Sequence, residues 1–278
     1  MDLAREHRPR IVHPLRRRRD LQRRRLRRGV YLLPSMFTLG NMFCGYACVV
    51  FAMRGDYETA APFVALAVVL DMLDGRIARL TGTTSAFGLE FDSLADVISF
   101  GMAPAILTFA WGLAPLGRLG WAAGFIFVTA GAIRLARFNI QTSTDKRYFV
   151  GMPIPAAASV PAATVYVYPS GLHDFQSALP ALALMIVPAV LMVSTITFRS
   201  FKSIDLQARR SYKVLLLLAI GLVAIATHPR WTLLALAYTY LVSAFVGMAA
   251  NRIRRRGAVS PPVPEESQED PKTPPQGG

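Results

Sequence analysis

Residues 71–104 of the sequence read DMLDGRIARLTGTTSAFGLEFDSLADVISFGMAP. Four aspartates, Asp71, Asp74, Asp92 and Asp96, lie here in segments whose neighbours are almost wholly apolar. A carboxylate in such a segment is expensive and marks a functional site. If both flanks are helical, the i,i+3 and i,i+4 spacings place each pair of acids on one helix face. The short polar link TGTTSAFG lets the chain fold back, so we expect the four carboxylates to meet.

Carboxylates that meet in this way repel one another unless divalent cations lie between them. Their hard oxygen ligands suit Mg²⁺, Mn²⁺ or Ca²⁺ rather than zinc. On a helical wheel Gly75 and Ala78 share the face of the acids, which leaves room for a bulky ligand, and Arg79 can contact phosphate oxygens. A short DxxDG motif alone is typical of a helix end with surface acids. The full spacing favours a metal and phosphate site, because surface acids do not explain four charges in apolar segments.

These residues carry a resemblance to a known family. The D-x2-D-G-x2-A-R-x8-G-x3-D-x3-D signature of the CDP-alcohol phosphotransferase (phosphatidyltransferase) family is reproduced by Asp71, Asp74, Gly75, Ala78, Arg79, Gly88, Asp92 and Asp96. Four further runs resemble the phosphatidylserine synthase branch: LPSMFTLGNMFCGY (33–46), SFGMAPA (99–105), RLARFN (134–139) and FVGMPIPAAA (149–158). The likeness covers roughly residues 30–205.

The resemblance implies an enzyme that transfers the phosphatidyl group from CDP-diacylglycerol to the hydroxyl of L-serine, giving phosphatidylserine and CMP. The attack is expected to be direct and assisted by two divalent ions, Mg²⁺ or Mn²⁺. Asp71, Asp74 and Asp92 are the expected main ligands, and Asp71 and Asp92 bridge the two ions. Asp96 is the expected acceptor of the hydroxyl proton and a further candidate ligand.

The resemblance also implies substrate contacts. Gly75, Ala78, Arg79 and Gly88 are expected to bind CDP-diacylglycerol, with Asn41 and Gly45 beside the cytidine. The carboxylate of serine needs a cation, and the candidates are Arg134, Arg137 and Lys202, assisted by Asn139. Each cation has an alternative interpretation as a positive-inside anchor. The acyl chains require a groove between spans, and Pro153, Pro155 and Pro161 either border such a cavity or start and kink a helix.

Composition independently indicates a membrane protein. Of 278 residues, 53% are hydrophobic and 17% charged, which is more apolar than a soluble domain of this size needs. The net charge of +14 is concentrated at the ends of the chain, outside long apolar segments. This distribution favours an anionic membrane surface over nucleic acid as the partner.

The apolar segments predict an all-α integral membrane protein with about eight transmembrane helices, each near the length needed to cross a bilayer. The predicted spans are 32–53, 60–80, 92–114, 119–140, 153–170, 177–198, 212–228 and 231–250. Lys and Arg gather on one side, whereas the opposite side has only Arg54, Arg118 and Arg230. The positive-inside rule therefore predicts that both termini and the metal site face the cytoplasm, in the cell (inner) membrane.

Three regions follow from these patterns. Residues 1–29 form an arginine-dense cytoplasmic arm that fixes topology and is a candidate surface helix on anionic lipid. Residues 30–250 form the transmembrane phosphatidyltransferase domain. Residues 251–278 contain a Pro-, Glu- and Gln-rich run and are expected to be a disordered cytoplasmic tail. The family resemblance also implies a homodimer.

Alternative functions remain open from the sequence alone. The same transfer to another alcohol, glycerol 3-phosphate or an inositol phosphate, keeps the acid motif unchanged. A cation transporter would use the aspartates as a transport site, but it leaves Gly75, Ala78 and Arg79 unexplained. A lipid-binding scaffold leaves the acids unexplained. Cys44 and Cys48 lie one turn apart inside the first span and indicate packing rather than a disulfide or a metal site.

Overall fold

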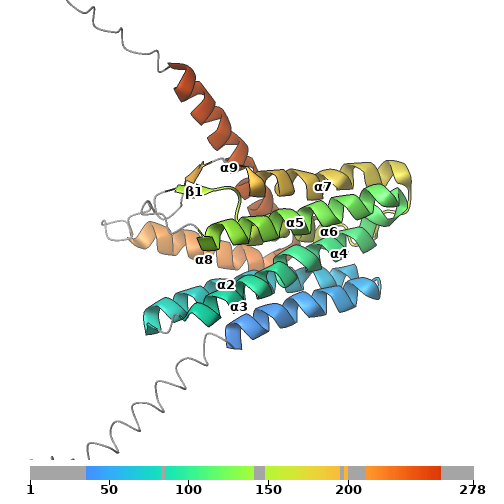
Figure 1. Cartoon of the computed structure of the whole chain (residues 1–278). Coiled ribbons are helices and arrows are strands. Elements are labelled where there is room, and N and C mark those ends of the chain that lie inside the picture. Colours follow the sequence, from blue (N-terminus) through green and yellow to red (C-terminus); the bar gives the residue numbers. More distant parts are fainter. Residues whose placement is uncertain (1–35, 83–84, 141–147, 195–196, 200–210, 258–278) are drawn as a thin grey trace, which may run out of the picture.

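The computed structural model describes residues 36–82, 85–140, 148–194, 197–199 and 211–257. Within these ranges the chain forms eight helical segments, most of which run roughly parallel or antiparallel, whereas the last one crosses the others at an angle (Figure 1). They are Met36–Met53, Tyr57–Thr81 (α2), the continuous helix Ala86–Leu116, Arg118–Ile140 (α5), Ile154–Val167 (α6), Phe175–Val193 (α7), Ser211–Thr227 (α8) and Pro229–Gly257 (α9). Each overlaps one of the eight predicted spans.

Four of these helices are long and apolar enough to cross a membrane. They are Met36–Met53, Ala86–Leu116, Arg118–Ile140 and Phe175–Val193. The helical architecture and four of the eight predicted membrane spans are therefore supported. α6 is also apolar but shorter, and it begins at the two prolines Pro153 and Pro155, which suit the first turn of a helix.

Two boundaries differ from prediction. α9 continues to Gly257, so residues 251–257, expected to belong to the tail, are helical. Their Asn-Arg-Ile-Arg-Arg-Arg sequence contains good helix formers, and this explains the extension. The predicted arm 1–29 and the rest of the predicted tail, 258–278, lie outside the described residues.

The long helix Ala86–Leu116 is irregular in two places. It consists of α3 (Ala86–Asp96), a π-helical turn (Val97–Met102), α4 (Ala103–Thr108), a second π-helical turn (Phe109–Leu113) and a short 3₁₀ turn (Ala114–Leu116). Pro104 lies in the first turn of α4 and has no backbone N–H to donate to the preceding turn. The first π-helical turn begins directly after Asp96, and such turns are frequent at functional sites.

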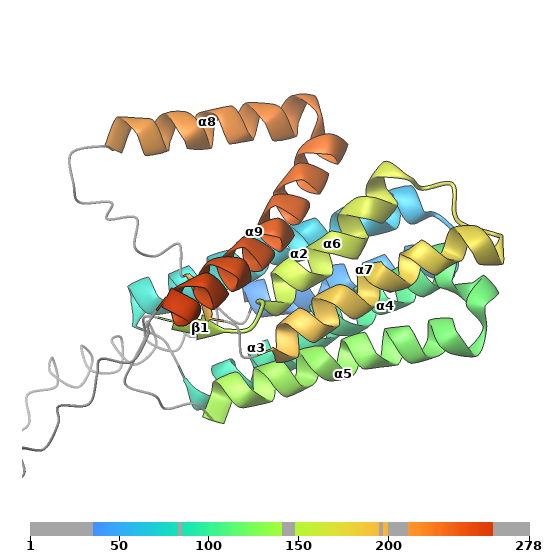
Figure 2. The ribbon, with the colours of Figure 1, turned by 90° about the horizontal axis from the view of Figure 1, so that it is seen from above.

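Small residues let the helices pack closely. α5 packs against α7, and α6 lies between α2 and α9. Many of the buried core positions are alanines, among them Ala60, Ala67, Ala157 and Ala181. The view from above shows α8 apart from the rest of the bundle, where α9 is its main neighbour (Figure 2).

One two-stranded element was not predicted. β1 (Tyr148–Val150) pairs antiparallel with β2 (Thr197–Arg199), with Phe149 opposite Phe198. The pair lies at the end of the bundle where α2 ends and α3 begins (Figure 1). Aromatic and β-branched residues suit such strands, but runs of three are too short for a periodicity to reveal them. The described fold is therefore helical apart from this pair.

Candidate active site

The four aspartates lie on α2 and α3, and the prediction that both flanks are helical is confirmed. α2 ends at Gly82, whose φ of 62° is the left-handed conformation that glycine adopts readily. α3 begins after Ser85, whose side-chain oxygen accepts a hydrogen bond from the backbone N–H of Gly88 at 3.0 Å. The chain therefore reverses direction over a few residues and carries the second pair of acids back towards the first.

Three of the carboxylates meet. Asp71, Asp92 and Asp96 each offer an oxygen atom, and these atoms lie within 4.8 Å of one another. The Oδ1 atom of Asp92 is buried and has no hydrogen-bond partner among the described residues. An unpaired buried carboxylate oxygen beside two further carboxylates needs a cation, and oxygen ligands of this kind suit a hard divalent ion. The donor set therefore fits a divalent metal.

Asp74 lies beside this group but not in it. Its carboxylate is buried and accepts a hydrogen bond from the hydroxyl of Thr38 on the first described helix. A spacing of three residues turns Asp74 by about 60° from Asp71 around α2, because an α-helix has 3.6 residues per turn. The structure thus pairs Asp74 with Thr38, and its predicted role as a metal ligand stays a prediction.

Asn41 and Gly45 contact the α3 side of the site. The side-chain amide of Asn41 donates a hydrogen bond to Asp96 at 3.2 Å, and the hydroxyl of Ser99 donates to the backbone carbonyl of Asn41 at 2.9 Å. A Cβ atom at Gly45 would lie 2.7 Å from the Cα atom of Ser99. Gly45 therefore allows the first helix to approach closely. The predicted contact of both residues with cytidine is not tested by these contacts.

The other predicted donor-binding residues lie towards the adjoining ends of α2 and α3. Gly75 and Arg79 are exposed, and the Nε atom of Arg79 donates a hydrogen bond to the backbone carbonyl of Gly75 at 2.7 Å. Ala78 is half-buried on the same helix. Gly88 takes part in the Ser85 cap described above. The open face at Gly75 agrees with the predicted room for a ligand.

Arg134 is a largely buried cation near the acids. It lies on α5, interacts electrostatically with Asp96 and Tyr240, and its Nε atom is buried without a hydrogen-bond partner among the described residues. The structure therefore brings a guanidinium group with unused donor capacity to the edge of the carboxylate group.

The other three residues predicted to bind the substrate serine are Asn139, Arg137 and Lys202. Asn139, near the end of α5, donates a hydrogen bond to the hydroxyl of Ser93 on α3 at 3.1 Å and so ties these two helices together. Arg137 is half-buried on α5. Lys202 lies outside the described residues.

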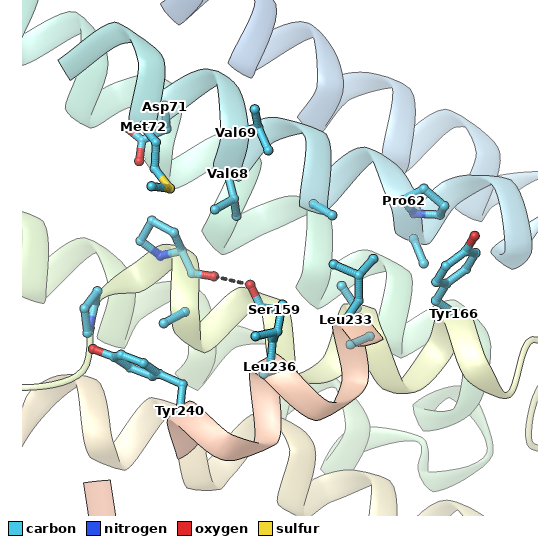
Figure 3. Close-up of a pocket in the computed structure, with 18 residues that line it drawn as sticks. Pro62, Val68, Val69, Asp71, Met72, Ser159, Tyr166, Leu233, Leu236 and Tyr240 are labelled. Carbon is cyan, nitrogen blue, oxygen red and sulfur yellow. Dashed lines mark hydrogen bonds between the residues drawn. The ribbon is translucent and has the colours of Figure 1, made fainter. Parts of the chain in front are cut away.

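An apolar groove of about 540 Å³ leads away from the acids (Figure 3). It lies between α2, α6 and α9, and Asp71 lines one end of it. Pro153 and Pro155 both start α6 and line the groove, so both interpretations left open by the sequence apply to them, whereas Pro161 is buried within α6 and is absent from the lining. The predicted cavity bordered by prolines is thus present beside the acids.

Sequence reasoning missed several residues of this site. Thr38 was missed, and Asn41, although expected beside the cytidine, was not expected to contact an aspartate. The i,i+3 spacing of the two residues in an apolar helix could have indicated that both face the acids. Ser93 and Ser99 are polar residues in the apolar helix that bears Asp92 and Asp96, and this pattern gave a weaker indication that they lie near the site. Tyr240 comes from α9, far along the chain, and nothing local in the sequence pointed to it.

Comparison with known proteins gives a family match. The family model described as CDP-alcohol phosphatidyltransferase matches residues 31–194, which include all four aspartates. The chain is 39% identical over 216 residues to a protein of Helicobacter pylori (strain J99) named CDP-diacylglycerol–serine O-phosphatidyltransferase. This match covers 77% of the present chain and 89% of that relative.

Two further relatives come from other organisms. A Mycobacterium leprae protein with the same name is 32% identical over 228 residues, covering 79% of this chain and 76% of the relative. An archaetidylserine synthase of Methanothermobacter thermautotrophicus is 39% identical over 168 residues, covering 60% of this chain and 69% of the relative. Both names describe the transfer or synthesis of a serine-containing lipid.

Proposed function

Because the chain belongs to the CDP-alcohol phosphatidyltransferase family, we propose that it transfers the phosphatidyl group of CDP-diacylglycerol to L-serine. The products are phosphatidylserine and CMP. The names of the bacterial relatives support this donor and acceptor. The observation that carries the proposal is the group of Asp71, Asp92 and Asp96 at one end of an apolar groove in an integral membrane protein.

The carboxylate group is the proposed site of Mg²⁺ or Mn²⁺. Asp71, Asp92 and Asp96 would hold the metal, with Asp74 as the fourth ligand implied by the family signature. Two bound divalent ions supply charge neutralisation of the pyrophosphate and stabilisation of the attacking and leaving oxygens. The unpaired Oδ1 atom of Asp92 supports a cation at this position.

Asp96 is the proposed general base. Its Oδ1 atom accepts the hydrogen bond from Asn41, which leaves Oδ2 for the acceptor hydroxyl. The serine oxygen forms a bond to the phosphorus that bears the diacylglycerol, and its proton passes to Asp96. The bond from that phosphorus to the bridging oxygen breaks, and the bridging oxygen leaves with CMP. No separate protein nucleophile is part of this scheme.

Other residues orient the two substrates. Gly75 and Ala78 leave space along α2 for the nucleotide, and Arg79, released from the carbonyl of Gly75, reaches a phosphate oxygen. Arg134 is the proposed partner of the serine carboxylate, because it lies near Asp96 and its Nε atom has no partner among the described residues.

The same acids would serve a different acceptor equally well. Glycerol 3-phosphate or an inositol phosphate is therefore the alternative substrate, and each would need more positive charge than serine near Arg134. A cation transporter is the alternative from another class, and the family match argues against it.

We also propose an orientation and an assembly. The metal site, the basic arm 1–29 and both termini face the cytoplasm, as the distribution of Lys and Arg predicts, and all eight helices belong to the domain in the cell (inner) membrane. Fusion of a reporter that is active only in the cytoplasm to the C-terminus tests this orientation. The assembly is a homodimer, which cross-linking in membranes tests.

The first experiment measures CMP release by purified protein given CDP-diacylglycerol and Mg²⁺ or Mn²⁺. Separate reactions contain L-serine, glycerol 3-phosphate, an inositol phosphate or no acceptor. We expect release that requires serine and yields phosphatidylserine, and a loss of about a hundredfold or more in Asp96→Asn. Asp174→Asn, an exposed aspartate before α7, is the matched control and should retain activity.

Each outcome leads to a different conclusion. Release with another alcohol would replace serine as the acceptor and keep the rest of the scheme. Absence of release with every acceptor would overturn the enzyme proposal. Cation flux into liposomes containing the protein would then test the transporter alternative.

A further inference from the structure

The groove beside the acids has two distinct ends. Asp71 and Tyr240 lie at one end, and Pro62 and Tyr166 lie at the other (Figure 3). Between them the lining is almost wholly apolar and comes from α2, α6 and α9. The one hydroxyl in the middle, Ser159, already donates a hydrogen bond to the backbone carbonyl of Pro155 at 2.8 Å. The groove thus suits a hydrocarbon rather than a polar ligand.

The length of the groove is close to that of a lipid chain in one leaflet. Pro62 and Asp71 are nine residues apart on α2, which corresponds to about 13 Å at 1.5 Å per residue. Half of a hydrocarbon core of about 30 Å is about 15 Å. The groove therefore extends from Asp71 towards Tyr166 over about the depth of the hydrocarbon in one leaflet.

The rim of the groove is open. Val69, Met72 and Leu236 line it, and each of these side chains is more than half exposed, at 51%, 53% and 56%. With α2 and α9 in the bilayer, as proposed above, these exposed side chains face lipid. A chain can therefore enter sideways from the membrane, without its apolar part crossing water.

The far end is held by interactions among all three helices. The guanidinium group of Arg230, at the start of α9, lies over the ring of Tyr166 on α6, 5.4 Å from the ring centroid. The same guanidinium group forms an ion pair with Glu58 in the first turn of α2. A cation above an aromatic ring is attracted to it. Tyr166 is therefore fixed at the end of the groove.

We propose that Tyr166, which closes the far end of the groove expected to hold an acyl chain of the donor, sets the chain length the enzyme prefers. This inference rests on the proposed function, because the donor is the lipid that brings its phosphate to Asp71. A chain that ends before Tyr166 leaves apolar surface uncovered. A longer chain must bend out through the rim at Val69 and Leu236.

The test is a competition among CDP-diacylglycerols with saturated chains of graded length, with the products separated by mass spectrometry. Tyr166→Ala opens the far end and should shift the preferred donor to one with a longer chain. Ala65→Phe adds a ring between Asp71 and Tyr166 and should shift the preference to shorter chains. Tyr166→Phe keeps the ring beneath Arg230 and should keep the original preference.

Matched controls separate chain-length selection from general effects. Tyr168→Ala changes an exposed tyrosine two positions away, and Ala122→Phe adds the same ring on an exposed face of α5. Neither residue lines the groove, so both variants should keep the original preference. If Tyr166→Ala does not fold, the chain-length preferences of Ala65→Phe and Tyr166→Phe still test the proposal. Active groove variants with unchanged preference would overturn the inference, whereas absence of CMP release by the unmodified protein would overturn the proposed function itself.

Discussion

The side-chain amide of Asn41 donates a hydrogen bond to a carboxylate oxygen of Asp96 at 3.2 Å, although 55 positions of sequence separate the two residues. Asn41 is 0% exposed and Asp96 8% exposed, so this bond is shielded from solvent. The hydroxyl of Ser99 holds the backbone carbonyl of Asn41 from the same side. The first helix therefore fixes the orientation of the proposed general base.

Replacement of Asn41 by leucine should lower kcat while leaving both KM values nearly unchanged. The apolar side chain fills a similar volume but leaves Asp96 free to rotate, and loss of such a supporting contact at a metal site reduces activity by about tenfold to a hundredfold. Steady-state CMP release measures both parameters. Gln176→Leu removes an exposed amide on α7 and is the control. A raised KM for CDP-diacylglycerol with normal kcat would instead support the cytidine contact that the sequence predicted.

Thr38→Val should destabilise the protein. Valine matches threonine in shape but cannot donate to Asp74, whose buried carboxylate would lose its partner on the first helix. A buried acceptor left without its donor costs about 1–3 kcal/mol in free energy of unfolding. Equilibrium denaturation in detergent measures this difference. Thr59→Val, at an exposed position in the first turn of α2, should have an effect near zero, and equal stability of both variants would contradict the prediction.

The sequence predicted the acid-bearing hairpin because the spacing of the four aspartates is a pattern within one short stretch of the chain. Charges at fixed spacing inside apolar segments indicate both a helix face and a function. The structure brings Asp71, Asp92 and Asp96 together, whereas the expected fourth member, Asp74, lies beside them. Helix ends were also within reach, since Ser85 and Gly82 are typical capping residues. The π-helical turn after Asp96 could not be predicted, because the residues there are mostly apolar and their pattern does not reveal a change in helical pitch.

Contacts between helices that are far apart in the sequence could not be predicted from local patterns. The family resemblance placed Asn41 near the cytidine, but nothing in the sequence indicated the hydrogen bond that its side chain donates to Asp96. Tyr240 lines the groove and Arg230 contacts Tyr166 only because α9 packs against α6. When every face of a helix is apolar, periodicity does not say which face meets a neighbour. The short β1–β2 pairing likewise depends on helices that bring two distant segments together.

Arg134→Lys should raise the KM for serine more than the KM for CDP-diacylglycerol. Lysine keeps the charge near Asp96 but loses the planar pair of donors that suits a carboxylate. We expect an increase in the serine KM of about tenfold, which corresponds to the loss of one charge-assisted hydrogen bond. Initial rates with each substrate varied in turn give the two values. Arg118→Lys, an exposed position at the far end of α5, is the control, and a uniform fall in kcat alone would indicate that Arg134 only supports the fold.

Gly45→Ala should lower stability and activity together. The added Cβ atom would lie 2.7 Å from the Cα atom of Ser99, so the backbones of the first helix and the π-helical turn must separate. Overpacking of this kind costs about 1–3 kcal/mol, and the shift also moves Asn41, one turn away on the same face, relative to Asp96. Adding Ser99→Ala should not rescue the variant, because the closest contact includes the backbone.

The matched control for this substitution is Gly221→Ala. A Cβ atom at Gly221, within α8, would have no neighbouring atom within 4 Å, so alanine should stabilise the helix there by about 0.5–1 kcal/mol. Denaturation in detergent and CMP release with serine measure both variants. If Gly45→Ala matched the unmodified protein in both measurements, the first helix would not need its close approach to Ser99, and the orientation of Asp96 would have to depend on contacts within α3 and α5.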